Sequence, residues 1–77
     1  MPLDPLPDWV PARRREIGVR IRAARRNAGL TQEQLAEHVG RDRKTIVRWE
    51  NGYSVADLDD LLLLAYVLGV PLADLVR

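Results

Sequence analysis

Apolar residues recur at helical spacing once the N-terminal prolines are passed. They stand four, three and four positions apart: Ile17, Ile21, Ala24 and Ala28. Because this spacing places the apolar side chains on one face, with arginines between them, it predicts an amphipathic helix. Pro11 suits a first helical turn and Gly29 a helix end, so we expect the helix to span about residues 11–28. Gly18 inside this helix predicts the close approach of another helix.

Two shorter helices follow, joined by a turn around a glycine. Thr31 and Gln34 have the spacing of a capping box, so we expect the first of these helices to begin at Thr31 and to end at Gly40. Asp42 can cap the second helix, which ends before Gly52, a residue suited to the left-handed conformation after a helix. Two short helices joined by three residues form a helix-turn-helix.

A fourth helix is predicted between Asp57, a capping residue, and Gly69, and Pro71 opens a short last helix. One face of the fourth helix is apolar: Leu58, Leu61, Ala65 and Leu68. Its second face carries further apolar residues: Leu62, Leu63, Tyr66 and Val67. Since a surface helix normally has a polar outer face, we expect this second face to be covered. A second subunit can cover it, or side chains near the N-terminus can do so: Leu3, Leu6 and Trp9.

The N-terminal residues differ in composition from the rest of the chain. Four of the five prolines lie within the first eleven residues, and proline favours an extended backbone. We therefore divide the chain into a proline-rich arm, residues 1–10, and a helix-turn-helix domain, residues 11–77. With 77 residues and no cysteine, this domain is expected to be all-α, with one small core and no disulfide.

Charge is distributed unevenly, although the formal net charge is only +1. Residues 13–50 hold eleven arginines and lysines against five acids, a net charge of +6, whereas residues 1–12 carry −2 and residues 51–77 carry −3. A basic middle between acidic ends indicates a surface that faces a polyanion such as nucleic acid. The alternative is a solvated basic face without a partner.

The sequence offers little for catalysis, metal binding or membrane insertion. His38 and Ser54 are the only residues of their types and stand on different elements, so they assemble no nucleophile and base. Asp57, Asp59 and Asp60 suit a helix N-terminus better than a metal. We expect no enzymatic activity, no cofactor and no small-molecule substrate. No apolar run reaches the roughly 18–20 residues that span a bilayer, and no signal peptide is recognisable, so we expect a cytoplasmic protein.

The third helix carries the candidate chemistry. Ile46 and Trp49 can face the core, and the opposite side is expected to read DNA bases through four residues: Arg43, Lys44, Val47 and Arg48. A helix fits the major groove, where arginine and lysine bind guanine and an apolar group contacts the thymine methyl. Phosphate contacts are expected from three polar residues: Gln32, Thr45 and Asn51. Asn51 equally suits a plain helix-ending role.

The segment GLTQEQLAEHVGRDRKTIVRWENG, residues 29–52, resembles the helix-turn-helix of the phage-repressor, Xre-like family of DNA-binding proteins. The likeness extends from about Ile17 to Leu75. It implies a compact five-helix bundle, a homodimer on a palindromic operator, and the base and phosphate contacts named above. It also implies an ion pair between Arg25 and Glu50 that orients the first helix against the third. The basic residues of the third helix replace amides of some phage members, so the likeness implies no base preference.

The leading hypothesis is a sequence-specific regulator of transcription that binds double-stranded DNA as a homodimer, most simply a repressor or autoregulator. The rival hypothesis is a protein-interaction module of the same fold, such as an antitoxin or a transcriptional bridging factor. Its contact surface would be the second face of the fourth helix, at Leu62, Leu63 and Tyr66, together with the proline-rich arm.

Overall fold

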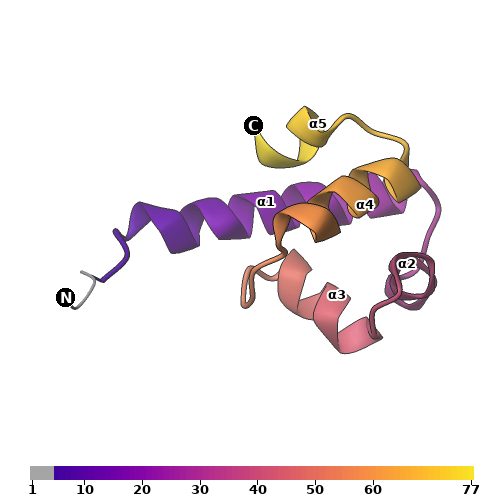
Figure 1. Ribbon diagram of the computed structural model, residues 1–77, viewed down its shortest axis with the longest axis horizontal. Coiled ribbons are helices and arrows are strands. Elements are labelled where there is room, and N and C mark those ends of the chain that lie inside the picture. The colour runs from indigo at the N-terminus through magenta and orange to yellow at the C-terminus, as the bar shows by residue number, and fades with distance from the viewer. Residues whose placement is uncertain (1–4) are drawn as a thin grey trace.

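The computed structural model describes residues 5–77, which form five α-helices. Their bounds are α1 Trp9–Asn27, α2 Gln32–Val39, α3 Arg43–Glu50, α4 Leu58–Leu68 and α5 Leu72–Val76. The long helix α1 is the axis of the molecule, with α2 and α3 on one side of it and α5 on the other (Figure 1). The expected all-α bundle of five helices is confirmed.

Local capping signals set the starts of α2 and α4. The Thr31 hydroxyl accepts a hydrogen bond from the Gln34 backbone N–H at 3.1 Å, and the Thr31 N–H donates to the Gln34 side chain at 2.9 Å. Asp57 and Asp60 form the same reciprocal pair at the start of α4, at 2.8 and 3.3 Å. These bonds satisfy backbone donors that have no partner inside a helix. The two predicted starts are therefore confirmed.

Helix α1 begins two residues earlier than the sequence predicted. Its first residue is Trp9, preceded by Asp8, so residues 9 and 10, which we expected in the arm, form its first turn. Pro11 is the third helical residue. Proline, which has no backbone N–H, is tolerated there because the N–H groups of the first turn have no acceptor inside the helix, so no helical hydrogen bond is lost.

Every helix contributes to one core. The buried apolar residues are Ile21 of α1, Leu35, Ala36 and Val39 of α2, Ile46 and Trp49 of α3, Leu64, Ala65 and Leu68 of α4, and Leu75 of α5. The expected core face of α4 was wrong at one end: Leu58 is 63% exposed, whereas Leu64 is fully buried. The buried stripe instead follows Leu61, Leu64, Ala65 and Leu68, and Leu58 lies in the exposed first turn.

Helices α1 and α3 touch backbone to backbone at Gly18, which confirms the predicted close approach. A Cβ atom at this position would lie 2.5 Å from the carbonyl oxygen of Trp49 and 2.6 Å from that of Glu50. No side chain fits between atoms at these distances. The C-terminal end of α3 is therefore seated directly on the α1 backbone.

Within residues 5–77, no helix combines the length and the apolar character needed to cross a membrane.

We predict that Gly18→Ala destabilises the fold. The added methyl group must push α3 away from α1, and overpacking of this kind costs about 1–3 kcal/mol, which exceeds the gain of up to about 1 kcal/mol in helix propensity. Urea unfolding followed by circular dichroism measures the change. Val19→Ala, at an exposed position of the same helix, is the control and should change stability by less than about 0.5 kcal/mol. A Gly18→Ala variant as stable as the wild type would contradict the contact.

Candidate nucleic-acid interface

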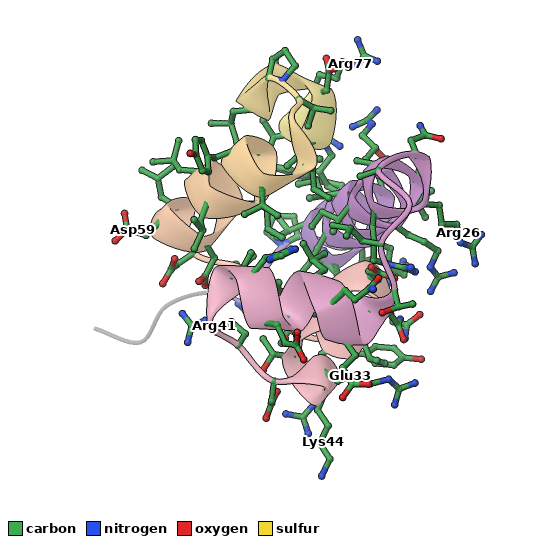
Figure 2. The ribbon with its side chains drawn as sticks, turned by 90° about the vertical axis from the view of Figure 1, so that its right-hand side faces the viewer. Arg26, Glu33, Arg41, Lys44, Asp59 and Arg77 are labelled. Atoms are coloured by element: carbon green, nitrogen blue, oxygen red, sulfur yellow. The ribbon has the colours of Figure 1, made fainter. Side chains whose placement is uncertain are left out.

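The outer face of α3 carries three exposed cations. Arg43, Lys44 and Arg48 are exposed and form no side-chain hydrogen bond or ion pair within residues 5–77, while Ile46 and Trp49 are buried on the opposite side. Lys44 points away from the bundle at the end formed by α2 and α3 (Figure 2). The cations are therefore available to an external partner.

The cap of α3 lies beside these cations. The Asp42 carboxylate accepts hydrogen bonds from the Thr45 hydroxyl at 2.7 Å and the Thr45 N–H at 2.9 Å. These bonds, helped by the nearby charges of Lys44 and Arg48, lower the pKa of Asp42. Because the Thr45 hydroxyl donates to Asp42, it is not free to donate to a phosphate in this arrangement.

Val47, the fourth expected base-reading residue, is half-buried.

Glu50 joins three helices at one buried carboxylate, 2% exposed. From α1, Arg25 donates through Nε to Oε2 at 2.6 Å and through Nη2 to Oε1 at 3.0 Å, and Arg22 donates through Nε at 3.4 Å. From α2, the Gln32 amide donates at 3.2 Å. The structure thus contains the Arg25–Glu50 ion pair, and it turns one donor of Gln32 inward.

The charge of Glu50 depends on these donors. Burial by itself raises the pKa of the Glu50 carboxyl, but the hydrogen bonds from Arg25, Gln32 and Arg22 and the positive charge of Arg25 outweigh this effect, so the pKa lies below its ordinary value. The same pairing raises the pKa of Arg25. The carboxylate therefore stays ionised inside the bundle.

Asn51 ends α3 and forms a hydrogen bond with a side chain of α1. Its side-chain oxygen accepts a hydrogen bond from Arg22 Nη2 at 3.0 Å. This contact leaves the amide nitrogen of Asn51 available for a further acceptor. The sequence pattern did not predict a role for Arg22, although Arg22 stands three positions before Arg25 and therefore shares its side of the helix.

Other arginines of the basic middle serve the fold as well. Arg14 donates to the Gly52 carbonyl at 3.1 Å, and Arg41 pairs with Asp60 at 2.7 Å, which raises the pKa of Arg41. Two more donate to carbonyl groups at the chain end: Arg13 to Val76 and Arg20 to Arg77. The net charge of residues 13–50 therefore overstates the exposed positive surface, because several of these arginines bind groups of other elements.

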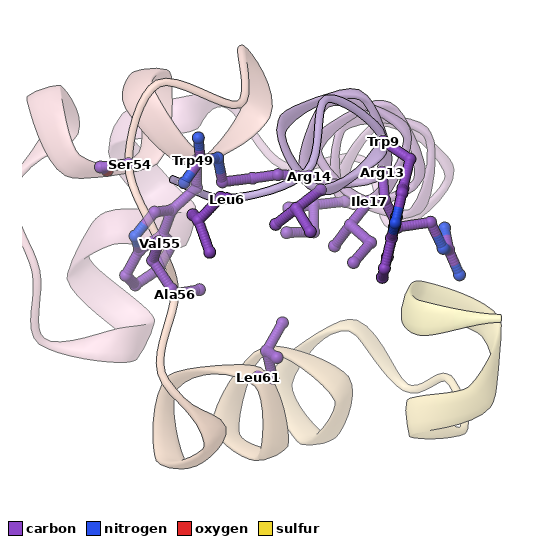
Figure 3. A pocket seen from close by; sticks show the side chains of 12 residues that line it. Leu6, Trp9, Arg13, Arg14, Ile17, Trp49, Ser54, Val55, Ala56 and Leu61 are labelled. Atoms are coloured by element: carbon purple, nitrogen blue, oxygen red, sulfur yellow. The ribbon is translucent and has the colours of Figure 1, made fainter. Parts of the chain in front are cut away.

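Three of the four residues on the second apolar face of α4 stay open in the described chain, whereas Val67 packs against the core. Leu62, Leu63 and Tyr66 are exposed, Tyr66 by 84%. Leu6 and Trp9 do not cover them, because they line a pocket of about 330 Å³ between α1, the α3–α4 loop and Leu61 (Figure 3). Leu3, the third candidate cover, lies outside the described residues. Intramolecular covering by Leu6 and Trp9 is therefore ruled out.

Comparison with known proteins places these features in a family. A family model described as helix-turn-helix matches residues 21–75. Among solved structures, the restriction-modification controller protein C.AhdI from Aeromonas hydrophila shares 34% identity, with a TM-score of 0.80 over 84% of this chain and 94% of its own. The transcription factor NHTF from Neisseria, described as hypothetical, shares 28% identity, with a TM-score of 0.77 over all of this chain and 87% of its own.

The clp gene regulator ClgR from Corynebacterium glutamicum has the same fold, with 24% identity and a TM-score of 0.79 over 99% of this chain and 90% of its own. No curated protein matches the sequence.

We predict that the contribution of Glu50 to stability is lost in acid. Because its pKa is lowered by folding, its stabilisation is fully present above the ordinary value of 4.5 and disappears as the pH falls through the lower folded value. At pH 7, Glu50→Gln should cost about 3–5 kcal/mol, since Arg25 loses its buried partner. Urea unfolding between pH 7 and pH 3 should show this difference shrinking as the pH falls.

Glu37→Gln, which removes an exposed carboxylate from α2, is the control and should change stability by less than about 0.5 kcal/mol at pH 7. A difference between wild type and Glu50→Gln that stays constant from pH 7 to pH 3 would contradict the role of the charge.

Proposed function

Because the chain belongs to the helix-turn-helix family of DNA-binding transcription regulators, of the Xre and Cro/CI type, we propose that it binds a specific double-stranded DNA site as a homodimer and acts as a repressor or autoregulator. The observation that carries this proposal is the set of three cations, unpaired within residues 5–77, on the outer face of a helix whose other face is buried. Such a regulator works where its DNA is, in the cytoplasm.

In the proposed complex, α3 lies in the major groove. Arg43, Lys44 and Arg48 donate to base edges, arginine best to the O6 and N7 atoms of guanine, and the exposed part of Val47 contacts a thymine methyl group. Their lack of partners among the described residues supports this role, because no bond to those residues has to break when DNA binds.

Three polar residues then position the protein on the DNA backbone. Gln32 and Asn51 keep donors that Glu50 and Arg22 do not use, and Thr45 can donate to a phosphate once its hydroxyl turns from Asp42. These contacts carry no base information, since every sequence has the same phosphates.

The dimer surface in this proposal is the open face of α4 at Leu62, Leu63 and Tyr66. Exposed apolar side chains in one patch are typical of an interface, and a two-fold axis lets the same patch serve both subunits. Residues 11–77 are the DNA-binding domain and residues 1–10 the arm, whose last two residues continue into α1.

The likeness to C.AhdI supports a controller of this kind, because that protein is described as a restriction-modification controller and 94% of it is covered. The exposed face of α4 equally favours the second candidate, a protein-interaction module such as an antitoxin or a bridging factor. Binding to DNA upstream of the protein's own gene, measured by mobility shift, distinguishes the two: the regulator shifts this DNA at nanomolar protein, and the interaction module does not.

We predict that base-reading and positioning residues differ in selection from a random duplex library. Arg43→Ala and Arg48→Ala should each cost about 1–3 kcal/mol on the preferred site and relax the preference at particular base pairs. Gln32→Ala should weaken binding to all sequences by a similar factor and leave the selected motif unchanged. If the two arginine variants select the wild-type motif with equal information at every position, the reading face is assigned wrongly.

We also predict that replacing Leu63 and Tyr66 together by glutamate gives a folded monomer that binds the operator weakly. Charges at the centre of an apolar interface oppose association, while exposed positions tolerate them in the monomer. Light scattering measures the mass and circular dichroism the fold. Val19→Glu, which changes an exposed apolar residue on α1, should keep the dimer mass. A double variant that remains dimeric would exclude this face as the interface.

A further inference from the structure

Three arginines lie in one row along α1: Arg15, Arg22 and Arg26. Their spacings of seven and four residues bring them to the same face of a helix. The row is about 16 Å long at 1.5 Å per residue, which corresponds to several steps along a DNA backbone. Arg15 and Arg26 are exposed and have no ion pair or side-chain hydrogen bond within residues 5–77.

The row lies directly beside the end of α3. The Cγ atom of Arg15 would be only 2.6 Å from a Cβ on Gly52, so the stem of Arg15 crosses the second residue after α3. Arg22 bonds both Glu50 and Asn51. Arg26 lies in the last turn of α1, five positions before the cap of α2. The row therefore borders the helix-turn-helix from the end of α3 to the turn before α2.

Positive and negative side chains lie on different sides of the bundle. Arg26 lies on the side opposite Asp59 of α4, and Lys44 projects from the end that α2 and α3 form (Figure 2). Glu16, the acidic residue next to Arg15 in sequence, pairs with Arg13. Within residues 5–77, Arg15 and Arg26 of the row thus have no acidic partner, whereas Arg22 is paired with Glu50.

We propose that this arginine row binds phosphates of the DNA strand that flanks the groove occupied by α3, and so lengthens the contact beyond the helix-turn-helix itself. The proposal rests on the proposed function. Guanidinium groups suit it because their planar donors match phosphate oxygens in pairs. Arg15 precedes the residues that match the family model, 21–75, whereas Arg22 and Arg26 lie within them.

The salt dependence of DNA binding tests the row. Each phosphate contact contributes about 0.9 to the slope of log affinity against log salt concentration. Arg15→Ala and Arg26→Ala should each reduce the slope by about this amount, and the double variant by about twice as much, with equal losses on operator and random DNA. Arg15→Lys should keep the slope of the wild type.

The matched control is Arg77→Ala, which removes an exposed arginine near α5, far from Lys44 (Figure 2), and should leave the slope unchanged. Within residues 5–77, the side chains of Arg15 and Arg26 form no hydrogen bond or ion pair, so thermal melting should show every variant folded, with only a small loss for Arg15→Ala, whose stem packs on Gly52. Phosphate-ethylation interference should lose flanking positions in the double variant.

If the wild type binds DNA with a steep slope that both alanine variants retain, the row is a solvated face and only this inference fails. If the wild type itself shows no salt-dependent binding to any duplex, the proposed function fails as well.

Discussion

The position of α3 depends on the buried carboxylate of Glu50. A charge inside a small bundle is unfavourable unless donors surround it, and here α1 and α2 supply them from Arg22, Arg25 and Gln32. The backbone contact at Gly18 sets the distance between α1 and α3. Helix α3 therefore cannot slide or rotate without separating charges or creating a clash, although its eight residues would not form a stable helix alone.

This constraint divides the arginines into two functional sets. The first set donates hydrogen bonds to carbonyl or carboxylate groups of other elements and so links the helices: Arg14, Arg22, Arg25 and Arg41. The cations of α3 make no such bonds in the part of the chain that the structure describes, and they extend from a surface that the first set holds in place. A DNA-binding face benefits from this division, because a helix that is already held in place loses less conformational entropy when it meets DNA.

The open apolar face of α4 and the cationic face of α3 belong to different parts of the surface. Lys44 marks one end of the bundle in Figure 2, and Asp59 of α4 lies on a flank away from it. A dimer formed through α4 would leave the α3 faces of both subunits uncovered. Two such faces related by a two-fold axis match a DNA site with two half-sites, so the proposed dimer and the proposed DNA contact are compatible.

The sequence by itself determined the helices and their order, because capping boxes, left-handed glycines and apolar spacing act over four or five residues. Thr31, Asp42 and Asp57 cap helices where the sequence predicted, and Gly18 marked a close contact before its partner was known. The sequence pattern predicted the start of α1 two residues too late, and it predicted Leu58 in the core where the structure has Leu64. Only the tertiary structure decided which arginines link helices and which stay free, and which apolar face of α4 is left open. Those choices depend on residues such as Arg22 and Glu50, 28 positions apart, that no local pattern connects until the chain is folded.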